Sequence, residues 1–464
     1  MQQPPTSHGY DGHVAVMAFP FGTHAAPMLA VTRRLATYCP TTIFSFFNTS
    51  ESNISVFSTA DEHKLVAPNV KAYELADGVP EGYAFTGKPQ ERIELFMKAA
   101  PRSFREAMEA AVSDAGGKAV SCLVTDAFFW FAAEMAEEMG VAWLPFWTAG
   151  VCSLSAHFYT DYIRDRLGSV RDDAVGHEEE PISCIPGMSK IKVGDLPEGV
   201  VFGDTQSFFS CMLQKMGLAL PKAAAVLINT FQELDPTITS DLNSKFKKFL
   251  TIGPVHSMSP SPAAADTYTC IPWLHKQKLA SVAYVGFGSV TTPPPHELVA
   301  LAEALEASNV PFIWSIRDSA KGNLPGGFLE RTHGSQGILV PWAPQTSVLA
   351  HVAVGVFITH GGWNSLVESV AGGVPMICRP FFGDQRLNGR MVQDVWQVGL
   401  KLGPGAFTKD GIIESLDQIL YQEKGKILRH NVRALKQLSD IAIGPNGSST
   451  INFMALSEFV SPNP

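Results

Sequence analysis

Short apolar runs alternate along the chain with segments whose apolar residues recur at helical spacing. The first run, residues 13–19, is followed by a loop and then by apolar side chains at positions 28, 29, 31, 35 and 36. Similar runs predict buried strands at 119–125, 141–146, 225–229, 282–286, 312–316, 338–340, 354–358 and 375–378. Strands that alternate with helices form parallel sheets covered on both faces, so we expect an α/β protein.

A change of composition divides this alternation into two parts. Residues 251–268 are rich in Pro, Ser and Ala and lack periodicity, which is typical of a linker. We therefore expect two Rossmann-like, doubly wound domains, 13–250 and 269–445, facing a central cleft. Residues 1–12 are expected to form a flexible tail, and residues 446–464 a helix that returns to the first domain.

Composition narrows the choice of partners and compartment. The 464 residues are 45% hydrophobic and carry a formal net charge of −9, which disfavours nucleic acid and anionic membranes as partners. The seven cysteines are scattered without a CxxC pair, as in a reduced cytosolic protein. With no signal peptide and no long apolar run, we expect a cytoplasmic monomer without integral membrane association.

Residues 360–365, with the sequence HGGWNS, are predicted to form a turn between a strand and a helix. Glycines allow close approach of the backbone to a ligand, and the N–H groups at a helix start favour an anion such as a diphosphate. An ordinary glycine turn has the same local pattern. The nearby GFGSV at 286–290 begins like a dinucleotide fingerprint but lacks its third glycine, so it argues little for NAD.

The longer stretch around this turn, residues 342–385, resembles the signature segment of plant UDP-dependent glycosyltransferases of family 1. It opens with Trp342, contains HGGWNS and closes with Asp384 and Gln385. DGVPEGY at 77–83, FWTAG at 146–150 and RPFFGDQ at 379–385 resemble the flavonoid 3-O-glucosyltransferase branch, and this likeness extends over nearly the whole chain. The resemblance implies a GT-B fold, a UDP-sugar donor and a flavonoid acceptor.

By that resemblance, the donor contacts fall into three groups. Trp342 would stack on uracil, with Ala343 and Gln345 at the base edge and ribose, while the two oxygens of Glu368 would accept the ribose hydroxyls. The expected diphosphate contacts are His360, Asn364, Ser365 and Ser289. The expected sugar contacts are Trp363, Asp384 and Gln385, with Thr23 and Thr148 near the sugar or phosphate.

Two positions bear on donor choice. In the family that the chain resembles, Gln at the position of Gln385 usually accompanies glucose and His often accompanies galactose. We expect glucose, with galactose as the alternative. Gly22 stands where relatives often have Ser near the phosphate and sugar, and a backbone N–H could replace that hydroxyl.

His24 and Asp126 are the candidate catalytic pair. His24 lies in the loop FPFGTHAAP after the first predicted strand, and Asp126 follows the strand 119–125. Taken alone, His24 could be an ordinary loop histidine. The resemblance places the catalytic base of the family in this loop and makes Asp126 its partner. Neutral imidazole could then take the proton of a phenolic hydroxyl.

The expected reaction is a single displacement that inverts the anomeric carbon. No Asp-x-Asp pair occurs in the chain. Because metal-dependent glycosyltransferases often carry their cation on such a pair, we expect no metal and no cofactor besides the donor substrate.

The acceptor side is the least determined part of the site. By position in the resembling family, Gln90 and His157 would hydrogen-bond flavonoid oxygens. Phe128, Phe208 and Phe382 could pack on its planar rings, although each could equally be an ordinary core residue.

Three other functions stay open from the sequence. The nearest is a galactosyltransferase or an enzyme for another small phenol. A non-catalytic UDP-sugar or flavonoid binding protein is a second, although the presence of both His24 and Asp126 argues against it. An NAD-dependent oxidoreductase is the third and lacks its fingerprint.

Overall fold

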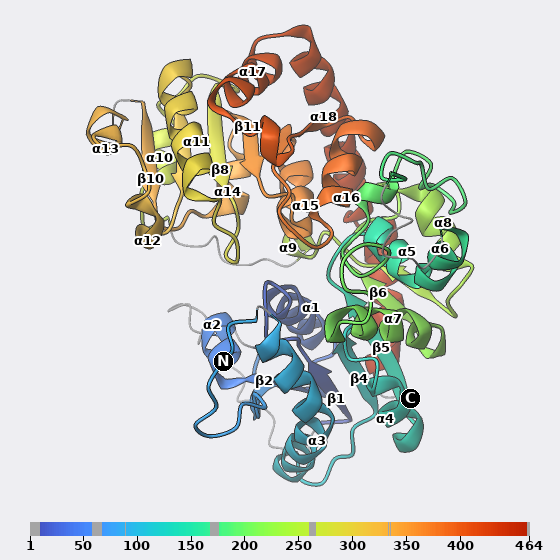
Figure 1. The fold of residues 1–464 in the computed structure, drawn as a ribbon. Coiled ribbons are helices and arrows are strands. Elements are labelled where there is room, and N and C mark those ends of the chain that lie inside the picture. The colour runs from blue at the N-terminus through green and yellow to red at the C-terminus, as the bar shows by residue number, and fades with distance from the viewer. Residues whose placement is uncertain are drawn as a thin grey trace. The chain divides into compact units, whose positions relative to one another are not determined.

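The computed structural model describes residues 10–57, 67–88, 90–167, 176–258, 266–332, 334 and 336–461. They form two compact units, which are described separately. The first unit lies within residues 1–174, 198–259 and 443–464, and the second within 175–197 and 260–442. Figure 1 shows a sheet flanked by helices in each unit.

The first unit is built on a parallel sheet of seven strands in the order β3-β2-β1-β4-β5-β6-β7. Its strands are β1 (Gly12–Met17), β2 (Thr42–Thr49), β3 (Val70–Leu75), β4 (Cys122–Asp126), β5 (Ala142–Trp147), β6 (Val226–Ile228) and β7 (Phe249–Thr251). Its helices are α1 (Ala25–Tyr38), α2 (Ser50–Phe57), α3 (Glu91–Asp114), α4 (Ala132–Met139), α5 (Val151–Phe158), α6 (Thr160–Leu167), α7 (Phe208–Ala219), η4 (Leu220–Lys222), α8 (Pro236–Asn243), α9 (Val255–Met258) and α19 (Ser448–Val460).

The second unit has a parallel sheet of six strands in the order β10-β9-β8-β11-β12-β13. Its strands are β8 (Val282–Gly286), β9 (Phe312–Ser315), β10 (Gly337–Val340), β11 (Val354–Thr359), β12 (Met376–Cys378) and β13 (Gly399–Lys401). Its helices are η3 (Val193–Asp195), α10 (Cys270–Leu274), α11 (Pro295–Ser308), α12 (Asp318–Lys321), α13 (Phe328–Thr332), α14 (Gln345–Ala350), α15 (Trp363–Gly372), α16 (Gln385–Arg390), η5 (Met391–Val395), η6 (Pro404–Ala406), α17 (Lys409–Leu420) and α18 (Glu423–Ala442).

Both sheets reverse their strand order beside their first strand. In the first unit, β1 lies between β2 and β4, and in the second unit β8 lies between β9 and β11. Ligands of doubly wound sheets bind beyond the carboxyl ends of the strands at such a reversal. The loops after β1 and β4, and those after β8 and β11, are therefore the places where functional side chains are expected.

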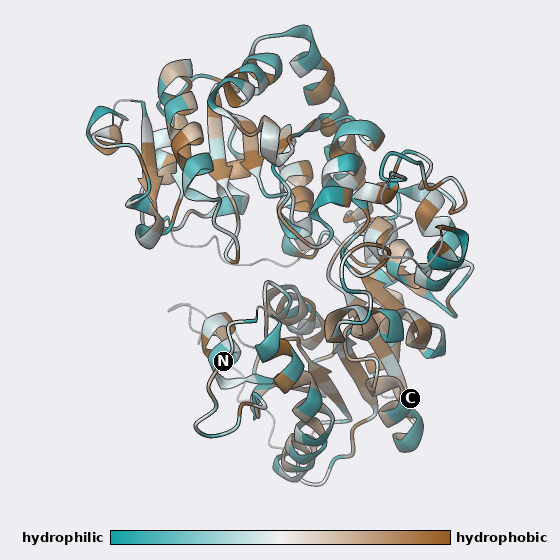
Figure 2. Cartoon of the chain, in the orientation of Figure 1, coloured by the Kyte–Doolittle hydropathy of each residue, from teal (hydrophilic) through white to brown (hydrophobic). Residues whose placement is uncertain are grey.

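The predicted α/β class with two doubly wound parallel sheets is confirmed. The burial of the strands explains why the sequence has continuous apolar runs. All six residues of β1 and of β11 are buried, because helices cover both faces of the sheet. Figure 2 shows the brown, hydrophobic residues concentrated in the strands. Among the described helices, none is both long and apolar enough to cross a membrane.

Four strands were not anticipated from the sequence. β3 is an edge strand whose middle positions are largely exposed, so it lacks a continuous apolar run. β2 mixes Thr, Ser and Asn with its apolar residues, and β7 and β13 have only three residues each. The expected strands at 282–286 and 354–358 agree with β8 and β11 to within one residue.

The expected domain boundaries differ from the two units at several points, of which two are the largest. Residues 176–197 pack with the second unit because the buried carboxylate of Asp195 pairs with Arg390, at 2.6 Å, and with Lys401. The expected linker from 251 includes the last residue of β7 and the helix α9, while residues 259–265 lie outside the described chain. Residues 1–9 of the expected tail also lie outside it.

Candidate active site

His24 and Asp126 are brought together by two adjacent parallel strands. β1 pairs with β4 in a register that sets Met17 beside Thr125, so the chain leaves both strands at the same edge of the sheet. His24 immediately precedes α1, and Asp126 is the last residue of β4. The Nδ1 atom of His24 lies 2.7 Å from Oδ2 of Asp126.

The surroundings of Asp126 determine which ring nitrogen of His24 carries the proton. The Asp126 side chain is only 2% exposed, and its Oδ1 accepts a hydrogen bond from the N–H of Phe128 at 3.0 Å. An ionised carboxylate can only accept, so Nδ1 of His24 must donate. In the described chain, Nδ1 of His24 lies within hydrogen-bonding distance of the Asp126 carboxylate and of the Thr148 hydroxyl, the latter at 3.2 Å. The lone pair of neutral His24 is therefore on Nε2, where it can receive a proton.

Aromatic rings pack on the His24 imidazole. Its centroid lies 5.2 Å from that of Phe19 and 4.8 Å from that of Phe128. Phe128 in turn contacts Trp147 at 5.8 Å and Phe209 at 5.9 Å. The expected Phe128 therefore lies beside the histidine, and the α7 residue that packs on it is Phe209, next in sequence to the expected Phe208. A planar aromatic molecule fits the chemistry of these rings.

His157 belongs to the same aromatic group. It lies on α5, is buried, and its ring packs edge-on against Trp147 with centroids 5.7 Å apart. Burial lowers the pKa of His157 to about 4, so its ring is neutral near pH 7. A neutral imidazole presents one donor and one acceptor nitrogen, which suits a hydroxyl or carbonyl partner.

The remaining expected residues of the first unit lie at the surface. Gln90 is exposed directly before α3. Glu91 accepts hydrogen bonds from the Tyr83 hydroxyl at 2.7 Å and from the Thr86 N–H at 2.8 Å. These bonds connect the loop before α3 to the first residue of the helix. Thr23 is exposed beside Gly22, whose φ of +66° strains any residue with a side chain. This conformation favours glycine at position 22.

In the second unit, His360 lies where the loops after β8 and β11 meet. A Cβ atom added to Gly288 would lie 2.9 Å from the His360 ring, and one added to Gly362 would lie 2.3 Å from it. Both glycines are therefore required by the position of this ring. Burial lowers the pKa of His360 to about 4, so the imidazole is neutral. Ser289, also in the loop after β8, is exposed.

The turn after β11 ends at the start of α15. Gly362 is extended and immediately precedes the ten-residue helix Trp363–Gly372. The N–H groups of its first turn lack helical acceptors and attract an anion. The Trp363 ring is buried and packs against Trp396 with centroids 6.1 Å apart, while Asn364 is half-buried. The helix start thus has the chemistry expected of a diphosphate site.

Gln345 connects the start of α14 with α15. Its Oε1 accepts a hydrogen bond from the buried Tyr284 hydroxyl at 3.1 Å. Its Nε2 donates to Oε2 of Glu368 at 2.6 Å and to the Ser365 hydroxyl at 3.2 Å. Gln345 therefore joins Glu368, the expected ribose residue, and Ser365, an expected diphosphate residue, in one network. Tyr284 is a member of this network that was not anticipated from the sequence.

Trp342 offers a surface for a base beside this network. Its side chain follows β10 and is 48% exposed, although aromatic residues of this size are usually covered. The next residue, Ala343, is buried. An exposed indole at the carboxyl end of a strand suits stacking with a heterocycle.

Two of the expected sugar residues, Asp384 and Gln385, lie at the start of α16, whereas Trp363 begins α15. Oε1 of Gln385 accepts hydrogen bonds from the N–H groups of Phe381, at 2.8 Å, and Phe382, at 3.4 Å. This directs the NH₂ group of the amide away from the backbone. Oδ2 of Asp384 accepts a hydrogen bond from Asn388 at 3.0 Å. The side chain of Phe382, an expected acceptor residue, is 48% exposed.

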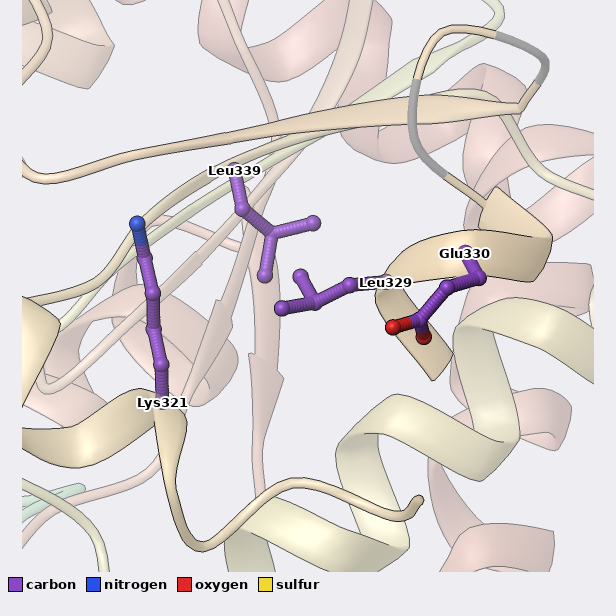
Figure 3. Close-up of a pocket in the computed structure, with 4 residues that line it drawn as sticks. All are labelled: Lys321, Leu329, Glu330 and Leu339. Atoms are coloured by element: carbon purple, nitrogen blue, oxygen red, sulfur yellow. The ribbon is translucent and has the colours of Figure 1, made fainter. Parts of the chain in front are cut away.

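A separate pocket lies beside β10. It has a volume of about 480 Å³ and is lined by Lys321, Leu329, Glu330 and Leu339, which Figure 3 shows around the space between α12, α13 and β10. None of the expected site residues lines it. Within the described residues, no three His, Cys, Asp or Glu side chains group as metal ligands.

Comparison with known proteins places the whole chain in a family. Residues 63–442 match the model of the family described as UDP-glucoronosyl and UDP-glucosyl transferase. The chain is 60% identical to anthocyanidin 3-O-glucosyltransferase of Vitis vinifera, with 97% of each chain covered. It is 55% identical to flavonol 3-O-glucosyltransferase of Arabidopsis thaliana, with 98% of each covered.

The solved structures agree with the fold. One similar structure is that of UDP-glucose: anthocyanidin 3-O-glucosyltransferase in complex with UDP. It is 39% identical, aligns with a TM-score of 0.90, and the alignment covers 98% of this chain and 100% of the other. The expected GT-B class is thereby confirmed.

Glu368 gives the second unit a stability that depends on pH. Burial raises the pKa of its carboxyl from 4.5 to about 7, against the opposing hydrogen bond from Gln345. A carboxyl whose pKa is raised by folding stabilises the folded state most below the unfolded pKa, and this contribution is lost as pH rises through 7. Glu368→Gln should therefore become more stable relative to wild type as pH rises from 4.5 to 7.5, by up to about 3 kcal/mol.

Thermal denaturation of both proteins at pH 5 and pH 8 measures this difference. Glu414→Gln, which changes an exposed glutamate on α17, is the matched control and should show no such trend. A constant difference in melting temperature between Glu368→Gln and wild type at the two pH values would contradict the assignment.

Proposed function

Because the chain belongs to the UDP-glucoronosyl and UDP-glucosyl transferase family, we propose that it transfers glucose from UDP-glucose to the 3-hydroxyl of flavonols and anthocyanidins. The observation that carries this proposal is the His24–Asp126 hydrogen bond of 2.7 Å, with Nε2 left as the basic nitrogen. It is supported by full-length relatives whose names give these acceptors and this sugar.

His24 acts as the general base. Its Nε2 takes the proton of the acceptor hydroxyl while the oxygen attacks the anomeric carbon, and Nδ1–H remains hydrogen-bonded to Asp126. The buried carboxylate stabilises the imidazolium that forms, because opposite charges interact strongly where water is excluded. General-base assistance of this kind contributes about 10²–10⁴-fold to the rate.

The second unit holds the donor. Trp342 stacks on uracil, while Gln345 and Glu368 bind the ribose. The N–H groups at the start of α15 hold the diphosphate with His360 and Ser289. This helix start also stabilises the negative charge that UDP gains as it leaves. One displacement from the side opposite UDP converts an α-linked donor into a β-glycoside.

The acceptor lies against the aromatic group around His24. Phe128 and Trp147 supply apolar rings, and neutral His157 supplies a hydrogen-bonding nitrogen. The geometry favours Phe209 over Phe208 as the α7 ring in this group. Flavonols and anthocyanidins are planar and carry hydroxyls at their edges, which matches rings beside a polar nitrogen.

We further propose a metal-independent enzyme that works as a monomer in the cytoplasm. The phosphate groups are held by a helix start and neutral side chains, which take the place of the cation that metal-dependent glycosyltransferases use. All seven cysteines are unpaired, as expected in a reducing compartment.

The direct test is glucosyl transfer with UDP-glucose, a flavonol and EDTA, followed by mass analysis and assignment of the attachment site. Wild type should form a 3-O-hexoside, and His24→Ala should be slower by about 10²–10⁴-fold because the base is lost. His430→Ala, at an exposed position on α18, is the control and should retain wild-type rates. A His24→Ala enzyme with unchanged kcat would overturn the assigned base, and absence of product with UDP-glucose bound would overturn the acceptor.

Donor choice can be tested at Gln385. Its Oε1 is occupied by two backbone N–H groups, so its NH₂ is oriented toward a sugar hydroxyl. Gln385→His should lower kcat/KM for UDP-glucose relative to UDP-galactose by about fivefold, since one lost hydrogen bond is worth about 1 kcal/mol. Competition between the two donors in one reaction measures this ratio. An unchanged ratio would exclude Gln385 from sugar selection.

A further inference from the structure

Asn388 is a buried polar residue that connects two parts of the donor site. It lies within α16, is 1% exposed, and was not among the residues expected from the sequence. Its Nδ2 donates a hydrogen bond to the carbonyl oxygen of Gly361 at 3.0 Å and another to Oδ2 of Asp384 at 3.0 Å. A primary amide has two N–H groups, so these two acceptors use both of them.

The two acceptors belong to different loops. Gly361 lies in the turn between β11 and α15, where the diphosphate is proposed to bind. Asp384 immediately precedes α16 and is proposed to bind the sugar. The side chain of Asn388 is therefore a direct bridge between the proposed phosphate turn and the proposed sugar carboxylate.

The backbone around this bridge is closely packed. Gly361 has φ of +81°, and a Cβ atom at this position would lie 3.4 Å from the carbonyl oxygen of Gln385. The N–H of Asn388 also donates to the carbonyl oxygen of Asp384 at 2.8 Å. The backbone fixes where Asp384 is attached, and the amide of Asn388 fixes the rotation of its carboxylate.

We propose that Asn388 is a positioning residue for the donor sugar. It holds the Asp384 carboxylate in a fixed orientation relative to the turn at Gly361, where the diphosphate is proposed to bind. This inference rests on the proposed function, because it requires Asp384 to bind the sugar of the donor. Asn388 does not touch the substrate. It acts by limiting the orientations of a carboxylate that would otherwise rotate about two side-chain bonds.

The position of the bridge predicts a selective effect. Trp342, Gln345 and Glu368, the proposed nucleotide residues, make none of the hydrogen bonds of Asn388. Loss of the bridge should therefore weaken recognition of the sugar more than recognition of UDP. A residue needed only for folding would weaken both ligands alike.

Asn388→Asp tests this with nearly the same side-chain volume. Ionised, the introduced carboxylate faces the Gly361 carbonyl and the Asp384 carboxylate and repels both. Protonated, it can donate one hydrogen bond and restore part of the bridge. Binding to UDP and to UDP-2-fluoroglucose, which reports the sugar contribution, is measured calorimetrically at pH 5.5 and pH 8 in the full chain.

The affinity of Asn388→Asp for UDP-2-fluoroglucose should fall at least about tenfold at pH 8 and recover in part at pH 5.5, relative to wild type at each pH. Its affinity for UDP should fall by a clearly smaller factor than its affinity for UDP-2-fluoroglucose at each pH. Asn431→Asp, which changes an asparagine on α18 that also donates to a backbone carbonyl, is the control and should behave as wild type. Equal weakening of both ligands, or of neither, would overturn the inference.

Asp384→Asn separates this inference from the proposed function. If this variant binds UDP-2-fluoroglucose normally, the proposed sugar site itself is wrong. If it binds UDP-2-fluoroglucose poorly while Asn388→Asp binds it normally, only the positioning role of Asn388 is wrong. Asn388→Ser, measured in the same way, replaces Asn388→Asp if that variant does not fold, and the same two comparisons then decide the question.

Discussion

The hydrogen bond between His24 and Asp126 depends on the pairing of two parallel strands. β1 and β4 are neighbours in the sheet, although 104 residues lie between the end of β1 and the start of β4. Because the two strands are parallel, the loops that follow them begin at the same edge of the sheet. Parallel strands need crossover helices, and reversal of the crossover direction beside β1 leaves this edge accessible to ligands. The second unit repeats the arrangement with β8 and β11. In each unit, the candidate functional residues are thus positioned by the same topological feature.

Buried partners then set the orientation of the functional side chains. Both oxygens of Asp126 are engaged, which fixes the ring of His24 and its tautomer. Gln345 and Gln385 are oriented by hydrogen bonds to their carbonyl oxygens, which leaves their NH₂ groups directed toward other partners. Polar groups held in this way lose little freedom when a substrate binds, so more of the binding energy remains for the transition state.

The sequence predicted the architecture better than the finer packing. Continuous apolar runs such as 282–286 reveal buried strands, whereas β3 at the sheet edge is buried only at its two ends and was missed. Neighbouring residues on a helix point about 100° apart. Without the exact boundaries of α7, the sequence could not decide whether the ring of Phe208 or that of Phe209 packs on Phe128. Asn388 lies three residues beyond the signature segment 342–385, and its proposed role depends on a long-range contact with Gly361. Only its spacing of four residues from Asp384 was visible in the sequence.

The most direct test of this account is a double-mutant cycle of kcat at His24 and Asp126, measured with UDP-glucose and a flavonol. If Asp126 acts through His24, the substitution Asp126→Asn should lower kcat strongly when His24 is present. The same substitution should have almost no further effect on kcat in the His24→Ala background. The double variant would then be about as active as His24→Ala alone. Losses that multiply in the double variant would show that the two residues act independently, which would contradict the central claim.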